Sequence, residues 1–365
     1  MTSKERIIKT VLHEKTDRTP FIFPFDPWPE TLELWHKQGL STNSCYTVNT
    51  GCDKGFMAIP AESLRLGFCP PFKEKIISEN NGKRIFQDQL GIIQEIKLGN
   101  VSIPNYLEYP VKSPDDWNRL KYERLQPAFE ERFLINPENL KKWAKEHNGI
   151  TQIGNFPYGL FGTARDLIGV EDLLIWFYDY PETVADIMNT LTDLWILIYK
   201  EVSKHIQIDC VHIWEDMSGK QGPLISPQMM REFMVPNYKK IRQFCDEYNV
   251  PVFSLDTDGD CDLLFEPLIE GGINLIYPFE VAAGSDVVEI KKRYPAKFCV
   301  MGGIDKRKIA MSEYDIDKEI ERIMPAIEMG GYIPALDHLI HPEISYSNFL
   351  YFSKKLKTAC GEGGE

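Results

Sequence analysis

Acidic side chains follow several short apolar stretches in the second half of the sequence. They are Glu215, Asp216, Asp256, Asp258 and Asp337, and His338 follows the last of them. Carboxylates that gather at one place repel one another unless a cation lies between them or their protonation states shift. These residue types therefore favour either the binding of a metal ion or cationic substrate, or proton transfer, at a single site.

Two of the aspartates are predicted to face the same way. Asp256 and Asp258 are two positions apart, and alternate residues of an extended segment point to one side. With His338 they offer oxygen and nitrogen ligands to a hard or borderline divalent cation and leave a position open; Asp337 is a further candidate ligand. Aspartates that follow strands also cap the next helix by accepting its backbone N–H groups. The sequence leaves both interpretations open.

Glu215, Asp216 and His338 are the candidates for acid and base catalysis. The two acids precede Met217–Pro223, a segment with two glycines that allow close approach to a ligand. His338 lies just past the last apolar stretch, where a functional histidine is favoured. His212 lies inside an apolar stretch, and we expect it to be a core histidine.

Six β-rich stretches recur in the second half, separated by segments with helical apolar spacing. They are Thr151–Asn155, Val211–Trp214, Pro251–Leu255, Ile273–Tyr277, Phe298–Met301 and Tyr332–Ala335. Repeated strand–helix units with almost continuously apolar strands indicate a parallel sheet covered on both faces. A β-like run at Phe21–Phe25 and one more strand in the irregular middle make eight. We therefore expect a (β/α)8 TIM barrel with the acidic groups at the carboxyl ends of its strands. An open doubly wound sheet is the alternative, but no glycine-rich dinucleotide fingerprint follows any strand.

Local signals mark helix starts and one hairpin. Helices are predicted over Ser3–Leu12, from Ser113 with Pro114, from Ser226 through Tyr238, and from Ser312 with Asp315; Lys83–Ile96 is predicted to form a hairpin that turns at Gly91. The aromatic run Phe21–Trp28 is expected to pack in the core or to floor an apolar pocket. We expect one domain over 1–365, with an N-terminal elaboration over 1–150 and regular β/α units over 151–365.

The composition excludes several classes of partner. The 365 residues include 41 Lys and Arg against 54 Asp and Glu, a net charge of −13, whereas duplex nucleic acids and anionic membranes require basic surfaces. No stretch approaches the roughly 20 apolar residues of a membrane span, and the charged Met1–Arg6 lacks a signal-peptide core. The eight cysteines include no CxxC pair, which is typical of reduced thiols. We therefore expect a cytoplasmic protein that binds neither nucleic acid nor membrane.

Segments spread nearly end to end resemble the uroporphyrinogen decarboxylase superfamily. They are Met1–Ile7, Asp17–Pro20, Gly162–Glu171, Ile213–Met217, Gly222–Pro227 and Gly331–His338. The resemblance implies a (β/α)8 barrel. It also implies one of two chemistries: cofactor-free decarboxylation of a porphyrinogen, or methyl transfer with a corrinoid protein.

The true decarboxylases of this superfamily resemble one another in an N-terminal segment, Met-Arg-Gln-Ala-Gly-Arg-Tyr, that clamps substrate carboxylates. The corresponding Phe25–Pro29 has no arginine here, and only His338 falls where the late histidine of the decarboxylases lies. An octacarboxylate would be held poorly at an acidic mouth without that arginine. Decarboxylation is therefore the alternative function.

The methyltransferase branch often holds zinc with a His-x-Cys pair and a late cysteine. The matching positions here are Asp256-x-Asp258 and a position at or beside Leu336. The resemblance thus implies either a differently ligated zinc site, formed by Asp256, Asp258 and His338, or a site that moves protons directly. It also implies a cobalamin carried by a separate corrinoid protein, since no cobalamin-binding module is visible in the chain, and it allows a homodimer.

The predicted function is methyl transfer from a small methylated donor, such as a methoxylated aromatic, to the cobalamin of that corrinoid protein. Cobalt(I) is a strong nucleophile, so the donor oxygen needs a Lewis acid or a general acid to leave. A non-catalytic barrel that serves as a scaffold is the remaining alternative.

Overall fold

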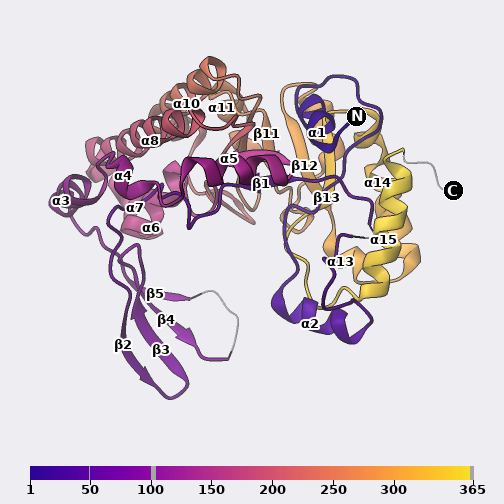
Figure 1. Ribbon diagram of the computed structural model, residues 1–365, viewed down its shortest axis with the longest axis horizontal. Coiled ribbons are helices and arrows are strands. Elements are labelled where there is room, and N and C mark those ends of the chain that lie inside the picture. The colour runs from indigo at the N-terminus through magenta and orange to yellow at the C-terminus, as the bar shows by residue number, and fades with distance from the viewer. Residues whose placement is uncertain (49, 100–103, 362–365) are drawn as a thin grey trace.

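A curled parallel sheet of seven strands is the centre of the protein, for which a computed structural model describes residues 1–48, 50–99 and 104–361 (Figure 1). In sheet order the strands are β1 (Phe56–Ala58), β6 (Ile150–Ile153), β7 (Cys210–Trp214), β10 (Val252–Asp256), β11 (Leu275–Tyr277), β12 (Cys299–Ile304) and β13 (Tyr332–Leu336). From β6 onward almost every strand residue is buried, as expected when both faces of a parallel sheet are covered. The predicted domain over 1–365 also includes residues 49, 100–103 and 362–365, which lie outside the described residues.

An irregular segment takes the place of the eighth strand, so the prediction of a strand at Phe21–Phe25 is wrong. Backbone hydrogen bonds join this segment to both edges of the sheet: Asp53 N–H donates to the Phe21 carbonyl at 2.9 Å, and Trp28 N–H donates to the Ile340 carbonyl at 3.1 Å. The sequence between these contacts contains two prolines, which have no N–H to donate to a regular ladder. The (β/α)8 type is therefore confirmed, with one wall made of irregular backbone.

Helices surround the sheet and cover its outer face (Figure 1). They are α1 (Ser3–Val11), α2 (Pro29–Lys37), α3 (Pro114–Arg124), α4 (Phe129–Arg132), α5 (Pro137–Glu146), α6 (Leu160–Ile168), α7 (Val170–Asp179), α8 (Pro181–Ser203), α9 (Pro227–Phe233), α10 (Val235–Glu247), α11 (Phe265–Glu270), α12 (Val287–Arg293), α13 (Lys306–Ile309), α14 (Glu313–Glu328) and α15 (Tyr346–Ala359), with 3-10 turns η1 (Asp262–Leu264) and η2 (Val281–Ala283). In the described part of the chain no helix is long and apolar enough to cross a membrane.

The predicted helix starts are confirmed by their caps. The Ser113 hydroxyl accepts the third N–H of α3, and Ser312 and Asp315 form a capping box at α14. The helix predicted from Ser226 through Tyr238 is instead two helices, α9 and α10, that meet at Met234. Pro236 is the reason, because proline has no N–H and its ring clashes with the carbonyl four residues earlier.

The N-terminal elaboration includes an antiparallel sheet that projects from the barrel. Its strands are β2 (Lys75–Asn80), β3 (Lys83–Gln87), β4 (Ile93–Lys97) and β5 (Asn105–Glu108). The predicted hairpin is confirmed as β3 and β4, and Gly91 between them has a φ of +88°, a conformation that favours glycine. In Figure 1 this sheet and α2 both extend beyond the same, lower side of the barrel.

The interior of the barrel changes character along its axis. At the amino ends of the strands it is apolar, and Ile7 and Val11 of α1 pack into it and close that end; their partners are Ile150, Cys210, Val252, Leu275, Cys299 and Ile333. Two positions further along β6, β7, β10 and β11 the side chains become polar, and they are Gln152, His212, Ser254 and Tyr277. Alternate residues of a strand share a face, so this polar set forms part of the inner wall.

Candidate active site

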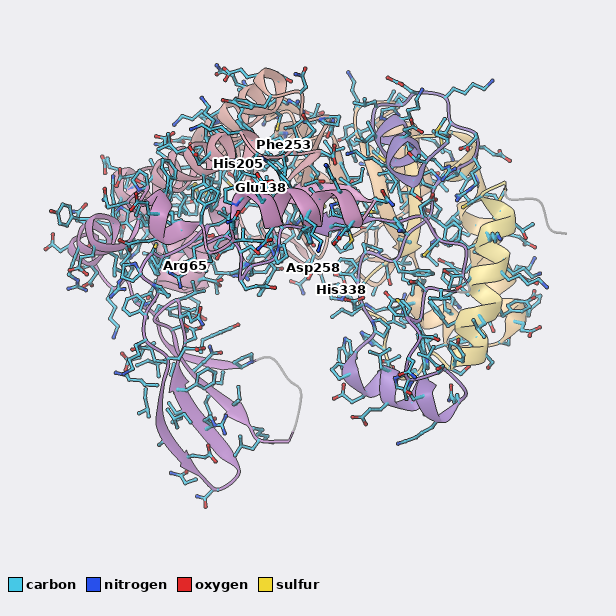
Figure 2. All side chains as sticks on the ribbon, viewed as in Figure 1. Arg65, Glu138, His205, Phe253, Asp258 and His338 are labelled. Atoms are coloured by element: carbon cyan, nitrogen blue, oxygen red, sulfur yellow. The ribbon has the colours of Figure 1, made fainter. Side chains whose placement is uncertain are left out.

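The carboxyl ends of β10 and β13 bring two of the predicted site residues together. His338 Nε2 lies 3.4 Å from Asp258 Oδ2, and Figure 2 shows both residues between the projecting β2–β5 sheet and α2 in that view. The ring of Phe25, from the irregular segment, stacks on His338 with centroids 5.1 Å apart and planes 11° from parallel. We call this end of the barrel, which contains Phe25, Asp258 and His338, the mouth.

Asp256 ends β10 at the mouth and is 8% exposed. No hydrogen bond or ion pair to the Asp256 carboxyl group is present among the described residues, whereas the carboxyl group of Asp258 pairs with His338. Burial raises its pKa well above the ordinary value, and the nearby charges of Asp258, Asp216 and Glu280 raise it further. Burial among other acids therefore favours the protonated form of Asp256.

Glu215, the residue after β7, is fully buried and accepts four hydrogen bonds. Their donors are the backbone N–H groups of Leu160, Phe161 and Gly162, at 3.1, 2.7 and 3.2 Å, and the Tyr238 hydroxyl at 2.6 Å. Burial raises the pKa of Glu215 to about 7, while the four donors oppose that rise. The four donors stabilise the carboxylate form, and burial outweighs them.

These contacts make Glu215 the cap of α6. Gly159 allows the close approach, since a Cβ on it would lie 1.7 Å from the Trp214 carbonyl oxygen. The geometry thus gives Glu215 a positioning function between β7 and α6, and its catalytic function stays a prediction.

Asp216 forms an ion pair with Arg165 at the edge of the mouth. Its Oδ2 accepts from Arg165 Nη1 at 2.6 Å, and the Arg165 guanidinium lies 4.9 Å from the ring centroid of Trp214. Asp216 has a φ of +42°, which is uncommon for a residue with a side chain. Asp216 therefore forms an ion pair with Arg165, and its acid–base function stays a prediction.

Asp337 matches the capping interpretation. It accepts from the N–H groups of Val281 and Lys306 at 3.1 and 3.2 Å, and so binds the starts of η2 and α13. Burial is the largest influence on its pKa and raises it to about 6, while Lys306 and these two N–H groups lower it. Both carboxylate oxygens are therefore occupied.

The predicted metal set is only partly assembled. Asp258 and His338 have the spacing of two ligands of one ion, but the described residues contain no group of three His, Cys, Asp or Glu side chains placed to hold a metal. Zinc sites in enzymes use three protein ligands and an open position. The side chains as they stand therefore do not form a three-ligand zinc centre, and zinc held by Asp256, Asp258 and His338 stays a prediction.

A chain of polar side chains that the sequence interpretation missed lies beneath Asp256. Tyr277 Oη lies 3.2 Å from His212 Nδ1, and His212 Nδ1 lies 2.9 Å from Ser254 Oγ. Burial lowers the pKa of His212 to about 3, so this core histidine is neutral. The signal was present in the sequence: Ser254 precedes Asp256 by two positions and therefore faces the same interior.

Comparisons with known proteins bear on both the fold and the family. The family model described as uroporphyrinogen decarboxylase (URO-D) matches residues 85–358. A solved structure titled "methyltransferase from Methanosarcina mazei" has a TM-score of 0.65 and 16% sequence identity, with 99% of each chain covered.

A B12-independent methionine synthase from Shewanella sp. W3-18-1 gives a TM-score of 0.38 at 10% identity, over 62% of this chain and 65% of that one. No curated protein matches the sequence. The likeness to the Methanosarcina mazei structure extends over the whole fold, and the family match covers most of the chain and includes the strands from β6 to β13. The chain belongs to the uroporphyrinogen decarboxylase family.

Proposed function

We propose that the protein is a corrinoid-dependent methyltransferase that takes a methyl group from a methoxylated donor. The observation that carries the proposal is the Asp256 carboxyl group, which is buried at the mouth near other carboxylates and receives no hydrogen bond from the described residues. The whole-length likeness to a structure titled as a methyltransferase supports the same reaction class.

The donor's leaving group decides what the site must supply. An alkoxide or phenolate leaves poorly, so cleavage of a methyl ether needs a general acid or a Lewis acid at the oxygen. Asp256 holds its proton because burial and the charges of Asp258, Asp216 and Glu280 disfavour its ionised form. It is thus suited to protonate the departing oxygen.

The proposed step transfers the methyl group from the ether oxygen of the donor to a reduced corrinoid. A reduced corrinoid, carried by a second protein, supplies the nucleophile that accepts the methyl group. The C–O bond of the ether breaks, its electron pair stays on oxygen, and the oxygen takes the Asp256 proton. The product leaves as an alcohol or phenol, and Asp256 remains as a carboxylate. We propose that His338, which lies beside Asp258 and is 24% exposed, returns a proton from water.

The surroundings of the mouth suit a neutral donor better than a polycarboxylate. Arg165 is paired with Asp216, and Lys306 lies 4.0 Å from Asp337. Each of these two positive side chains therefore already has an acidic partner. A porphyrinogen with many carboxylates would meet uncompensated acids here. Porphyrinogen decarboxylation therefore remains the alternative, and a scaffold without activity the second alternative.

The proposed reaction requires a second protein that reaches the mouth. The β2–β5 sheet and α2 extend beyond the barrel on the side where Asp258 and His338 lie (Figures 1 and 2). We propose that the corrinoid protein docks between them, so that the corrinoid meets the donor at the mouth.

The test is an anaerobic assay with chemically reduced cobalamin in place of the corrinoid protein. Methylation of the cobalamin is followed by its absorbance while a panel of methoxylated aromatics is supplied. We expect Asp256→Asn to lower the rate about 10²- to 10⁴-fold, the usual contribution of a general acid. The rate of the unaltered protein should fall as pH rises through the raised pKa of Asp256, because only the protonated acid is active. Full activity of Asp256→Asn, or porphyrinogen turnover by the unaltered protein, would contradict the proposal.

A further inference from the structure

The His338 ring is not oriented by a hydrogen bond to any of the described residues. Its Nε2 lies 3.4 Å from Asp258 Oδ2, beyond the usual range of about 2.7–3.2 Å for an N–H···O hydrogen bond. Its other ring nitrogen has no partner in the described part of the chain. Functional histidines are usually oriented by a hydrogen bond at that second nitrogen. The orientation of His338 therefore depends on packing.

Phe25 supplies this packing. Its ring covers one face of the His338 imidazole, with centroids 5.1 Å apart and planes 11° from parallel, an offset-stacked geometry that aromatic pairs favour. No second aromatic ring contacts His338 among the described residues. Phe25 also lies 6.1 Å, between ring centroids, from Tyr277 of β11. The ring on His338 is thus itself held against the inner wall of the barrel.

Backbone pairing brings the two stacked rings together. Pro27 and Ile340 form an isolated parallel bridge, and Trp28 N–H donates to the Ile340 carbonyl at 3.1 Å. Phe25 and His338 each lie two positions before this bridge. Because partners in a parallel pair keep the same offset along both segments, the irregular wall presents Phe25 to His338.

A second aromatic contact follows the same offset. Trp28 and His341 each lie one position after the bridge, and their ring centroids are 4.7 Å apart. This contact comes from the same wall and is of the same kind, but it involves a histidine outside the predicted site. Trp28 is therefore a matched control for Phe25.

We infer that Phe25 is a positioning residue, whose ring holds the His338 imidazole in the orientation that turns Nε2 toward Asp258. A stacked aromatic pair favours one orientation about 2- to 10-fold. Phe25→Leu keeps an apolar contact but presents no flat face, so the imidazole becomes free to rotate about its side-chain bonds. The consequence for catalysis rests on the proposed function, in which His338 returns a proton to Asp256.

The orientation is tested by NMR of the full chain with ¹⁵N-labelled histidine rings, where His338→Gln identifies the His338 signals. We expect Asp258→Asn to move the Nε2 signal of His338 in the unaltered protein. The same change should move it much less in the Phe25→Leu background, because the freed ring no longer faces residue 258. In the Phe25→Tyr background, which keeps an aromatic face, the full response should return.

The control variant separates stacking on His338 from a general loosening of the wall. Trp28→Leu removes the contact with His341 and should leave the response of His338 to Asp258→Asn intact. If Phe25→Leu does not fold, Phe25→Met takes its place. A response of His338 that Phe25→Leu leaves unchanged, or that Trp28→Leu reduces equally, would overturn the inference.

The catalytic consequence is tested by steady-state methyl transfer to reduced cobalamin. Phe25→Leu should lower kcat about 2- to 10-fold and leave KM nearly unchanged, because the stack on His338 is not part of donor binding. Phe25→Tyr should restore kcat. In a His338→Gln background Phe25→Leu should have no further effect, since a residue that acts through His338 is not additive with it. Equal losses in both backgrounds would contradict positioning through His338.

The two kinds of measurement keep the inference separate from the proposed function. The expected NMR responses in a protein that methylates no cobalamin would support the positioning by Phe25 and contradict the proposed reaction. Methyl transfer by a protein in which Phe25→Leu leaves the NMR response of His338 unchanged would support the reaction and contradict the positioning.

Discussion

Replacing Asp256 by asparagine should stabilise the protein while it abolishes the proposed chemistry. The unfolded carboxyl group has an ordinary pKa of about 3.9, whereas burial raises the pKa of Asp256 well above the ordinary value in the folded protein. The folded state therefore holds a proton that the unfolded state has released. Stability conferred by such a group is present below the unfolded pKa and is lost as pH rises towards the folded pKa.

The size of the change in stability follows from the one proton that the folded state holds on Asp256 and the unfolded state has released. Within that pH window the folded protein loses about 1.4 kcal/mol of stability per pH unit relative to a variant without the ionisable group. Asparagine has a similar shape and no charge, so Asp256→Asn should be the more stable protein, by a margin that grows at this rate. This slope applies at each pH between the unfolded and the folded pKa of Asp256, because the two states differ there by one bound proton.

The assay is urea unfolding at pH 5, 6 and 7, with the free energy of unfolding compared between the two proteins. Asp193→Asn is the matched control, because Asp193 lies on α8 with its side chain 63% exposed and makes only a surface pair with Lys240. Its effect should stay within about 0.5 kcal/mol and should not change with pH. The reasoning is refuted if Asp256→Asn is the less stable protein at pH 7, or if its advantage does not grow between pH 5 and pH 6.

Two further predictions concern the cap of α6 and the metal. Tyr238→Phe removes the 2.6 Å hydrogen bond to buried Glu215 and should lower the free energy of unfolding by about 2 kcal/mol, measured by urea unfolding. Tyr351→Phe is the control: it removes a hydroxyl that donates to Asp317 at the surface and should lower the free energy of unfolding by about 0.5 kcal/mol or less. Equal losses of stability in the two variants would contradict a structural function of Glu215. Zinc held by Asp256, Asp258 and His338 is the alternative to a protonated Asp256, and in that case elemental analysis of the purified protein finds about one zinc per chain, which Asp258→Ala loses. Zinc that stays after this change would place the metal elsewhere.

Much of the framework follows from local sequence. Apolar strands that alternate with capped helices specify the barrel, and caps such as Ser113 and Ser312 fix where helices begin because their hydroxyl groups bind nearby N–H groups. The irregular wall was not predicted. The run Phe21–Phe25 has a β-like composition, but its backbone pairs with residues near Asp53 and Ile340, and no local signal carries that information.

The sequence by itself determined the family, the barrel and the end of the barrel at which the acids lie. It predicted acid–base catalysis for Glu215 and metal binding for Asp256, because the sequence does not show which acid accepts hydrogen bonds. In the tertiary structure Glu215 receives donors from residues 160–162 and from Tyr238, while the Asp256 carboxyl group receives none from the described residues. The charge of a buried carboxyl group depends on which distant donors reach it.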